Sequence, residues 1–230
     1  MKYKHIFFDL DGTLWDFDFN SNETLLEIYH LYDLSNRGIL DCKEFICTYK
    51  AHNAKLWDLY NVDKISQKYL RRERFQRTLK NFGIHDFKLS EDIGERYVEL
   101  CPKKNKLFPY SFEVLDYLKS KYILHIITNG FEKTQHIKLE KSNLMPYFNQ
   151  VITSGKTGLK KPNPLIFAHA LDVAHAKNNE SIYIGDNLVV DILACQNSCI
   201  DGLYFNPKKI RHKENVKFEI SCLSQLMEIL

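Results

Sequence analysis

The stretch His-Ile-Phe-Phe-Asp-Leu-Asp-Gly-Thr-Leu, residues 5–14, decides the fold of this 230-residue chain. It predicts a short buried β-strand over residues 5–9, ending in two acids, Asp9 and Asp11. Side chains two apart on an extended segment point the same way, so the two carboxylates repel each other unless a cation or a proton lies between them. The stretch therefore indicates a metal-assisted site at the end of a strand, although a solvated Asp-x-Asp-Gly turn has the same pattern in isolation.

The composition is that of an ordinary globular protein, with 44% hydrophobic and 27% charged residues. The length allows one large domain or a core with one insertion. A net charge of +3 is too small to predict binding to a nucleic-acid polymer. Apolar runs such as residues 122–127 are too short to span a bilayer, and the sequence shows no signal-peptide pattern. We therefore expect a cytoplasmic protein without a membrane or nucleic-acid partner, and the oligomeric state stays open.

The second half of the chain alternates between strand-like and helix-like segments. Apolar, β-branched runs predict the strands, and apolar residues at helical spacing predict the helices between them. The predicted strands are residues 122–128, 148–153, 181–185 and 201–205, and the predicted helices are residues 132–142, 163–177, 188–197 and 222–230. This alternation predicts an α/β fold with a parallel sheet and helices on both of its faces.

Between the first strand and residue 110 the pattern changes, and no convincing strand is predicted. The predicted helices are residues 22–31, 41–59, 66–82 and 90–100. Ser66 and Ser90 are expected to open the third and fourth of these helices, and Gly83 to close the third. Four helices in series, inserted after the first strand, are expected to pack into a bundle.

Three further stretches bring polar groups to the carboxyl ends of predicted strands. They are Ile-Ile-Thr-Asn-Gly at 126–130, Lys-Lys-Pro-Asn-Pro at 160–164, and Ile-Gly-Asp-Asn-Leu-Val-Val-Asp at 184–191. Ligands of open parallel sheets bind beyond the carboxyl ends of the strands. We therefore expect these groups to converge with Asp9 and Asp11.

The four stretches, in this order, resemble the four motifs of the haloacid dehalogenase (HAD) superfamily of phosphohydrolases. The resemblance spans the chain, and only residues 16–100 are less diagnostic. It implies a Rossmann-like core formed by residues 1–16 and 104–230. It also implies that residues 17–103 are inserted as a helical cap, which closes over the active site.

The resemblance implies a role for each acid of the first motif. Asp9 is the expected nucleophile, whose carboxylate attacks phosphorus and forms an aspartyl-phosphate. Asp11 is the expected general acid and base, which protonates the leaving oxygen and then activates water. Because the dehalogenase branch lacks an acid at this second position, Asp11 favours phosphoryl transfer over carbon–halogen cleavage.

Mg²⁺ is the cofactor that the resemblance implies, since it is a hard cation that prefers oxygen ligands. Its expected ligands are the carboxylate of Asp9, the backbone carbonyl of Asp11 and the carboxylate of Asp186. Asp191 is expected to support these ligands from behind.

A phosphate clamp is expected from the second and third motifs. The Thr128 hydroxyl and the Asn129 backbone N–H are predicted to hold one phosphoryl oxygen, and the Lys161 ammonium to offset charge on the others. Lys161 is preferred over Lys160 because the clamp lysine of the family directly precedes the proline. In isolation, a strand-end hydroxyl bonded to backbone and a solvated loop lysine would explain the same residues.

The expected substrate is a small phosphomonoester, and further similarity favours a nucleotide. Several short stretches resemble bacterial pyrimidine 5′-nucleotidases, namely residues 15–18, 53–57, 74–75, 128–131 and 161–163. This resemblance implies a nucleoside 5′-monophosphate. Trp15, Phe17 and Trp57 are candidates for stacking on its base, although packing of the cap and the domain junction explains them equally well.

Two alternatives remain open at this point. One is a phosphatase of sugar phosphates or phosphoglycolate, or a phosphosugar mutase. The other is a catalytically silent binding protein on the same fold. The complete set of acids, with Thr128 and Lys161, argues against a silent protein, because a cluster of four acids is costly to maintain without a use.

Overall fold

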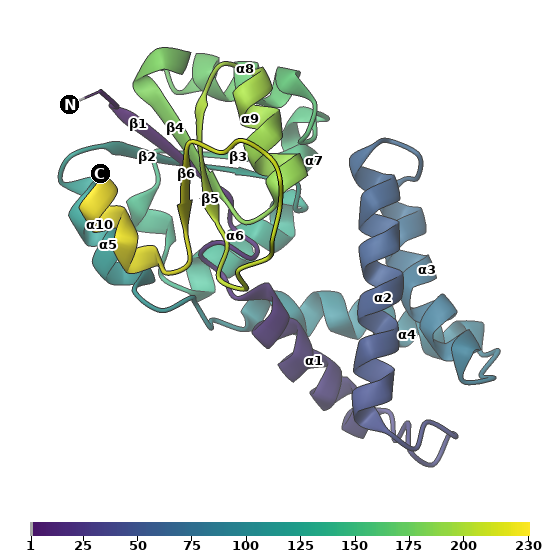
Figure 1. Ribbon diagram of the computed structural model, residues 1–230. Coiled ribbons are helices and arrows are strands. Elements are labelled where there is room, and N and C mark those ends of the chain that lie inside the picture. The colour runs from purple at the N-terminus through teal and green to yellow at the C-terminus, as the bar shows by residue number, and fades with distance from the viewer. Residues whose placement is uncertain (1) are drawn as a thin grey trace. The chain divides into compact units, whose positions relative to one another are not determined.

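The computed structural model describes residues 2–230, which form two compact units (Figure 1). One unit joins the N-terminal residues up to Phe17 to Asn105–Leu230, and the other unit is Asp18–Lys104. The chain passes between the units twice, and the sequence predicts each crossing one residue earlier, at residues 16–17 and 103–104.

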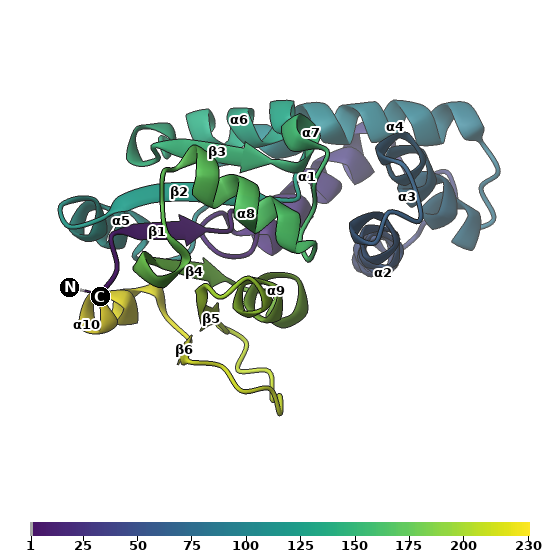
Figure 2. The ribbon, with the colours of Figure 1, turned by 90° about the horizontal axis from the view of Figure 1, so that it is seen from above.

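The first unit is built around a six-stranded sheet in the order β3-β2-β1-β4-β5-β6, with every neighbouring pair parallel (Figure 2). Its strands are β1 (His5–Phe8), β2 (Ile123–Thr128), β3 (Gln150–Thr153), β4 (Ser181–Gly185), β5 (Asp201–Phe205) and β6 (Phe218–Ile220). In the middle of the sheet, Phe7 lies opposite His125 of β2 and Tyr183 of β4. The carboxyl ends of these three strands therefore meet at one edge of the sheet.

Helices cover both faces of this sheet. In Figure 1, α8 (Pro164–Val173) and α9 (Ala194–Asn197) lie above it, and α5 (Ser111–Lys119) and α10 (Leu226–Ile229) lie below. The other helical segments of the unit are α6 (Glu132–Lys141), α7 (Ser154–Thr157), a π-helical segment (Leu188–Leu193) and three 3₁₀ turns (Met145–Tyr147, Asn178–Glu180 and Leu223–Gln225). The parallel sheet between two helical layers confirms the predicted Rossmann-like α/β class.

Side chains alternate between the two faces of each strand, and those on one face form a hydrophobic core with α8. Phe7, Ile127 and Tyr183, from three neighbouring strands, are buried against Ile166 and Phe167 of α8. The next residue along each strand points to the opposite face, where α5 contacts β2. Burial of each such large apolar side chain contributes about 1.5–3 kcal/mol, so the sheet is stabilised from both sides.

Several predicted elements of the first unit differ from the structure. The predicted helix over 163–177 ends at Val173, because His175 adopts a left-handed conformation with φ of 50°. The predicted helix over 188–197 is a π-helical segment followed by the short α9. The predicted terminal helix over 222–230 is reduced to a 3₁₀ turn and α10.

Apart from the 3₁₀ turns and the four-residue α7, two elements have no counterpart in the sequence-based prediction. One is α5, whose Val114, Leu115 and Leu118 form its buried face. The other is β6, which has only three residues and is therefore too short to show an alternating pattern.

The second unit contains four helices in sequence, as predicted: α1 (Phe17–Leu31, which begins in the first unit), α2 (Cys42–Asn61), α3 (Gln67–Asn81) and α4 (Phe87–Leu100), followed by a 3₁₀ turn (Cys101–Lys103). α3 packs against both α2 and α4. The Ser66 hydroxyl accepts a hydrogen bond from Tyr69 N, which confirms the predicted cap of α3, and Gly83 follows the end of this helix with φ of 74°. Within residues 2–230, no helix is long and apolar enough to cross a membrane.

The predicted start of the fourth helix at Ser90 is wrong. The helix begins at Phe87, because the Asp86 carboxylate accepts a hydrogen bond from Leu89 N at 2.9 Å and caps the first turn. Ser90 lies inside this turn, and its hydroxyl donates to the carbonyl of Phe87 at 2.8 Å. Both residues can cap a helix, and the one further upstream does so here.

Candidate active site

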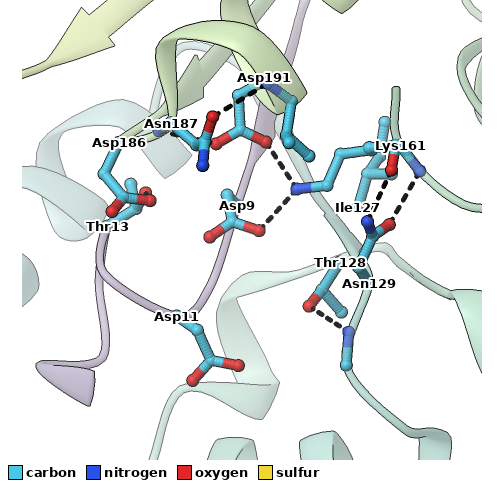
Figure 3. A network of polar contacts seen from close by, with 12 residues as sticks. Asp9, Asp11, Thr13, Ile127, Thr128, Asn129, Lys161, Asp186, Asn187 and Asp191 are labelled. Atoms are coloured by element: carbon cyan, nitrogen blue, oxygen red, sulfur yellow. Dashed lines mark hydrogen bonds and ion pairs between the residues drawn. The ribbon is translucent and has the colours of Figure 1, made fainter. Parts of the chain in front are cut away.

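Three carboxylates converge at the carboxyl edge of the sheet (Figure 3). Asp9 directly follows β1, Asp186 directly follows β4, and Asp191 lies in the π-helical segment after it. Their ligand oxygens all lie within 4.8 Å of one another. The backbone N–H of Asp9 donates to the carbonyl of Ile184 at 2.8 Å, which continues the pairing of β1 with β4 and fixes the first acid beside the second.

Two glycines make this close approach of acids possible. A Cβ on Gly12, whose φ is 91°, would lie 2.3 Å from Asp186 Oδ2. A Cβ on Gly185 would lie 2.5 Å from Asp191 Oδ2. Any side chain at either position would push an acid out of the cluster, so the glycines of the first and fourth motifs serve packing as well as turn geometry.

One buried ammonium joins the cluster. Lys161 is 2% exposed, and its Nζ donates to Asp9 Oδ1 at 2.6 Å, to Asp191 Oδ1 at 2.7 Å and to the Tyr183 hydroxyl at 2.7 Å. All three hydrogens of the ammonium are therefore used within the protein. Of the two adjacent lysines, Lys161 is the one that reaches the acids.

The cluster carries more negative than positive charge. Burial raises the pKa of Asp9 to about 7, with Asp191 and Asp11 adding to the rise and Lys161 opposing it. Burial, followed by the charge of Asp9, raises the pKa of Asp186 well above its usual range. Burial opposes the charge on Lys161, but Asp191 and Asp9 outweigh it and raise the pKa of this lysine. A set of oxygen ligands with excess negative charge fits a hard divalent cation such as Mg²⁺.

Thr128, at the end of β2, has a defined hydrogen-bond polarity. Its hydroxyl oxygen accepts from Gly130 N at 3.0 Å and from Gln135 Nε2 at 2.9 Å. A hydroxyl has two acceptor positions and one donor, so the proton of Thr128 remains to be donated. This polarity suits contact with an anionic oxygen.

The side chain of Asn129 connects two of the motifs. Its Nδ2 donates to the carbonyl of Lys161 at 2.7 Å, and its Oδ1 accepts from Lys161 N at 2.8 Å. Asn129 therefore holds the backbone that carries the buried ammonium, a role that the sequence did not predict. The predicted contact of its backbone N–H with phosphate stays a prediction.

Asp11 lies apart from the other acids. Its carboxylate points away from Asp9 and Asp186 in Figure 3. Lys138 Nζ donates to Asp11 Oδ1 at 2.5 Å, and Gln135 Nε2 donates to Asp11 Oδ2 at 2.7 Å. Both partners come from α6, the helix that follows β2.

The aromatic candidates for substrate contact have different surroundings. Trp15 is fully buried in the first unit, with Lys138 Nζ 4.3 Å from the centre of its ring, which favours the packing interpretation. Phe17 is partly exposed, and its ring centre is 6.3 Å from that of Trp15. Trp57, partly exposed on α2, packs edge-on against Tyr60. Contact of any of these rings with a substrate stays a prediction.

Sequence reasoning missed three polar residues around the site: Tyr183, Gln135 and Lys138. The hydroxyl of Tyr183 contacts both Lys161 and Asp191. The sign of this role in the sequence was a single tyrosine within a largely apolar predicted strand. Gln135 and Lys138 lie three apart and so share one face of a helix. Polar residues three apart in an amphipathic helix are usually solvated, so nothing in the sequence indicated that these two side chains are buried.

The fold and the site together define a class of hydrolase. The model of the haloacid dehalogenase-like hydrolase family matches residues 3–198, and the chain belongs to this family. The resemblance seen in the four motifs is thereby confirmed.

Individual proteins of known sequence or structure are similar to this chain over its full length. The chain is 30% identical over 234 residues to pyrimidine 5′-nucleotidase PynA of Streptococcus pneumoniae, covering 100% of this chain and 96% of that protein. It is 28% identical over 233 residues to pyrimidine 5′-nucleotidase YjjG of Escherichia coli, covering 100% and 99%. The crystal structure of YfnB of Bacillus subtilis, bound to magnesium, superposes with a TM-score of 0.90 at 25% identity, covering 100% and 99%.

Proposed function

We propose that this protein is a Mg²⁺-dependent phosphatase of nucleoside 5′-monophosphates with a pyrimidine base. The observation that carries the chemistry is the buried cluster of Asp9, Asp186 and Asp191 with a single ammonium, that of Lys161. This arrangement pairs a nucleophilic carboxylate with groups that hold a cation and an anionic phosphoryl group. Asp11 supplies the acid that phosphoryl transfer needs and dehalogenation does not.

The metal would be held by the carboxylates of Asp9 and Asp186 and by the backbone carbonyl of Asp11. Asp191 would support them, since Lys161, Tyr183 and the backbone N–H of Asn187 already bind its carboxylate. When bound, Mg²⁺ offsets the charge of the acids and polarises the phosphoryl oxygens.

The residues of the site divide the reaction into two steps. In the first, an Asp9 oxygen attacks phosphorus, the bond from phosphorus to the leaving oxygen breaks, and Asp11 gives a proton to that oxygen. In the second, Asp11 takes a proton from a water molecule, which attacks the aspartyl-phosphate and releases inorganic phosphate. Throughout, the Thr128 hydroxyl donates to a phosphoryl oxygen, and the charge of the Lys161 ammonium beside Asp9 offsets the negative charge of the phosphoryl group.

The nucleotide part of the proposal is supported by similarity over the full length. PynA and YjjG are both pyrimidine 5′-nucleotidases, and each alignment includes the second unit as well as the sheet. Phe17 and Trp57, both partly exposed, are the aromatic residues proposed to stack on the base.

Phosphate release from a panel of substrates tests the proposal. The panel contains UMP, dUMP, dTMP, purine nucleoside monophosphates, sugar phosphates and phosphoglycolate, each with Mg²⁺ and with EDTA. Asp9→Asn is the control for the nucleophile. We expect turnover that needs both Mg²⁺ and Asp9 and that favours pyrimidine nucleotides.

Each other outcome points to a defined alternative. Turnover of sugar phosphates or phosphoglycolate alone would keep the mechanism and overturn the substrate. Turnover that persists in Asp9→Asn or in EDTA would overturn the mechanism. A complete lack of turnover would favour a catalytically silent binding protein.

A further inference from the structure

Both oxygens of the Asp11 carboxylate are held by residues one turn apart on α6. Lys138 Nζ lies 2.5 Å from Oδ1, and Gln135 Nε2 lies 2.7 Å from Oδ2. We propose that Gln135 and Lys138 are positioning residues for Asp11, which set its orientation for proton transfer to the leaving oxygen. The inference rests on the proposed function, because it assigns a task to residues that support the general acid.

Lys138 is nearly buried and needs a hydrogen-bond acceptor at this place. Its side chain is 5% exposed and lies over the rings of Trp15, at 4.3 Å, and Phe17, at 5.8 Å. A buried ammonium is costly unless an anion pairs with it, and among residues 2–230 the carboxylate that pairs with Lys138 is that of Asp11. The aromatic rings restrict the lysine to one direction, so the ion pair fixes where Asp11 points.

Gln135 couples Asp11 to the phosphate clamp. Its Nε2 donates to Asp11 Oδ2 and to the hydroxyl oxygen of Thr128 at 2.9 Å, which uses both amide hydrogens. The reverse orientation of the amide would place its oxygen against Asp11 Oδ2, which is an acceptor in the ionised carboxylate. The amide oxygen is itself buried without a hydrogen-bond partner, so the two donated bonds set the position of this side chain.

The neighbouring backbone is shaped to admit the glutamine. A Cβ on Gly130 would lie 1.5 Å from Gln135 Nε2, so only glycine leaves room for it. The third residue of the Thr-Asn-Gly stretch is thus complementary to a side chain five positions further on. This fit is independent of the ion pair and places the same glutamine between the general acid and Thr128.

The two hydrogen bonds from Gln135 and Lys138 to Asp11 have a physical consequence at this edge of the sheet. Asp11 lies two residues after Asp9, close to a cluster that attracts a divalent cation. A mobile Asp11 carboxylate would be drawn to that cation as an additional ligand and would be lost as a proton carrier. Two donors on α6 hold the Asp11 carboxylate away from the cluster and so keep it from becoming a further ligand.

Leaving-group dependence tests this role, because a good leaving group needs no proton. The measurement compares kcat/KM for UMP, whose leaving oxygen is an alkoxide, with kcat/KM for p-nitrophenyl phosphate, whose phenolate is a stable anion. For Lys138→Met we expect kcat/KM on UMP to fall about 100-fold, the usual size of a general-acid contribution, and kcat/KM on p-nitrophenyl phosphate to fall far less. Gln135→Leu should show the same selectivity with a smaller loss.

Controls separate this role from a structural one. Asp11→Asn should show the same selective loss as Lys138→Met, and Lys141→Met, which alters an exposed lysine of the same helix, should match the wild type. If Lys138→Met does not fold, as judged by circular dichroism, Gln135→Leu carries the test alone. Equal losses on both substrates in the folded variants would overturn the inference while wild-type turnover keeps the proposed function. A wild type that hydrolyses neither substrate would overturn the proposed function itself.

Discussion

At the scale of single residues, Lys161 balances the charge of the site. Its ammonium is shared between Asp9 and Asp191, and the hydroxyl of Tyr183 takes its third hydrogen. Each of these partners is buried, so no water can replace the lysine without rearrangement. The ammonium therefore offsets the charge of the buried acids in the folded protein.

Replacing this lysine should destabilise the metal-free protein. Lys161→Met leaves two buried carboxylates without their cation, and we expect the free energy of unfolding to fall by about 3 kcal/mol. Urea unfolding in EDTA measures the change. Lys160→Met is the matched control, since Lys160 is only partly buried, and its stability should stay close to that of the wild type. Equal stability of Lys161→Met and the wild type would contradict the account.

At the scale of elements, α4 contains a glycine in its interior. Gly94 has no positive φ, and a Cβ there would lie 3.7 Å from the carbonyl of Arg71 and 3.7 Å from a ring carbon of Phe75. These are ordinary contact distances, so the neighbours would not have to move. The glycine thus weakens the helix without providing space for anything.

Gly94→Ala should therefore stabilise the protein. Alanine loses less backbone entropy on folding and is the better helix former, by roughly 0.5–1 kcal/mol in a helix interior. Thermal unfolding should show a higher midpoint, with unchanged activity. A lower midpoint would mean that α3 and α4 pack more closely around this position than the distances indicate.

The pair of strands β1 and β2 carries a buried acid-sensitive contact. His125 is fully buried, stacks on Phe7 and lies 3.1 Å from the ring nitrogen of His5. Burial, followed by the charge of His5, lowers the pKa of His125 to about 4, and burial also lowers the pKa of His5. Above pH 6.5 both the folded and the unfolded chain hold His125 neutral, so this residue has no effect on stability there.

Stability should be lost as the pH falls from 6.5 towards 4. In this window the unfolded chain binds a proton at His125 and the folded chain does not, which costs about 2–3 kcal/mol by pH 4. His125→Phe keeps the stacking and removes the proton site. Urea unfolding from pH 7 to pH 4 should therefore show a shallower loss in the variant, and parallel curves would refute this assignment.

At the scale of the whole molecule, we expect cation binding and folding to be linked. Burial raises the pKa values of Asp9 and Asp186, so the folded chain disfavours the charged forms of these acids when no cation balances them. A ligand that binds only the folded state stabilises it by about 2.7 kcal/mol at a concentration one hundred times its dissociation constant. Saturating Mg²⁺ should thus raise the thermal midpoint relative to EDTA.

Asp186→Asn provides the control for this linkage. The amide removes one charge from the cluster, so the variant should be at least as stable as the wild type in EDTA. It should also lose most of the stabilisation by Mg²⁺, because a ligand is missing. An undiminished Mg²⁺ effect in the variant would show that the cation binds elsewhere in the protein.

The sequence by itself determined the α/β class, the four-helix insertion and the residues of the four motifs. These features depend on local patterns: a buried strand followed by Asp-x-Asp-Gly, a lysine before proline, and a serine at the start of a helix. Such patterns reflect backbone conformation and the preference of each residue type within a few positions. The same locality explains the error at Ser90, where two possible cap residues four positions apart, Asp86 and Ser90, could not be ranked without the packing of the helix.

Only the tertiary structure decided how the polar groups are paired. Gln135 and Lys138 lie 124 and 127 positions from Asp11 in the chain, and Tyr183 lies 22 positions from Lys161. No local pattern distinguishes a lysine that will be solvated on a helix face from one that will be buried against a carboxylate. The parallel order of the strands brings these segments to one edge of the sheet, and the cost of burying an unpaired charge then selects the partners.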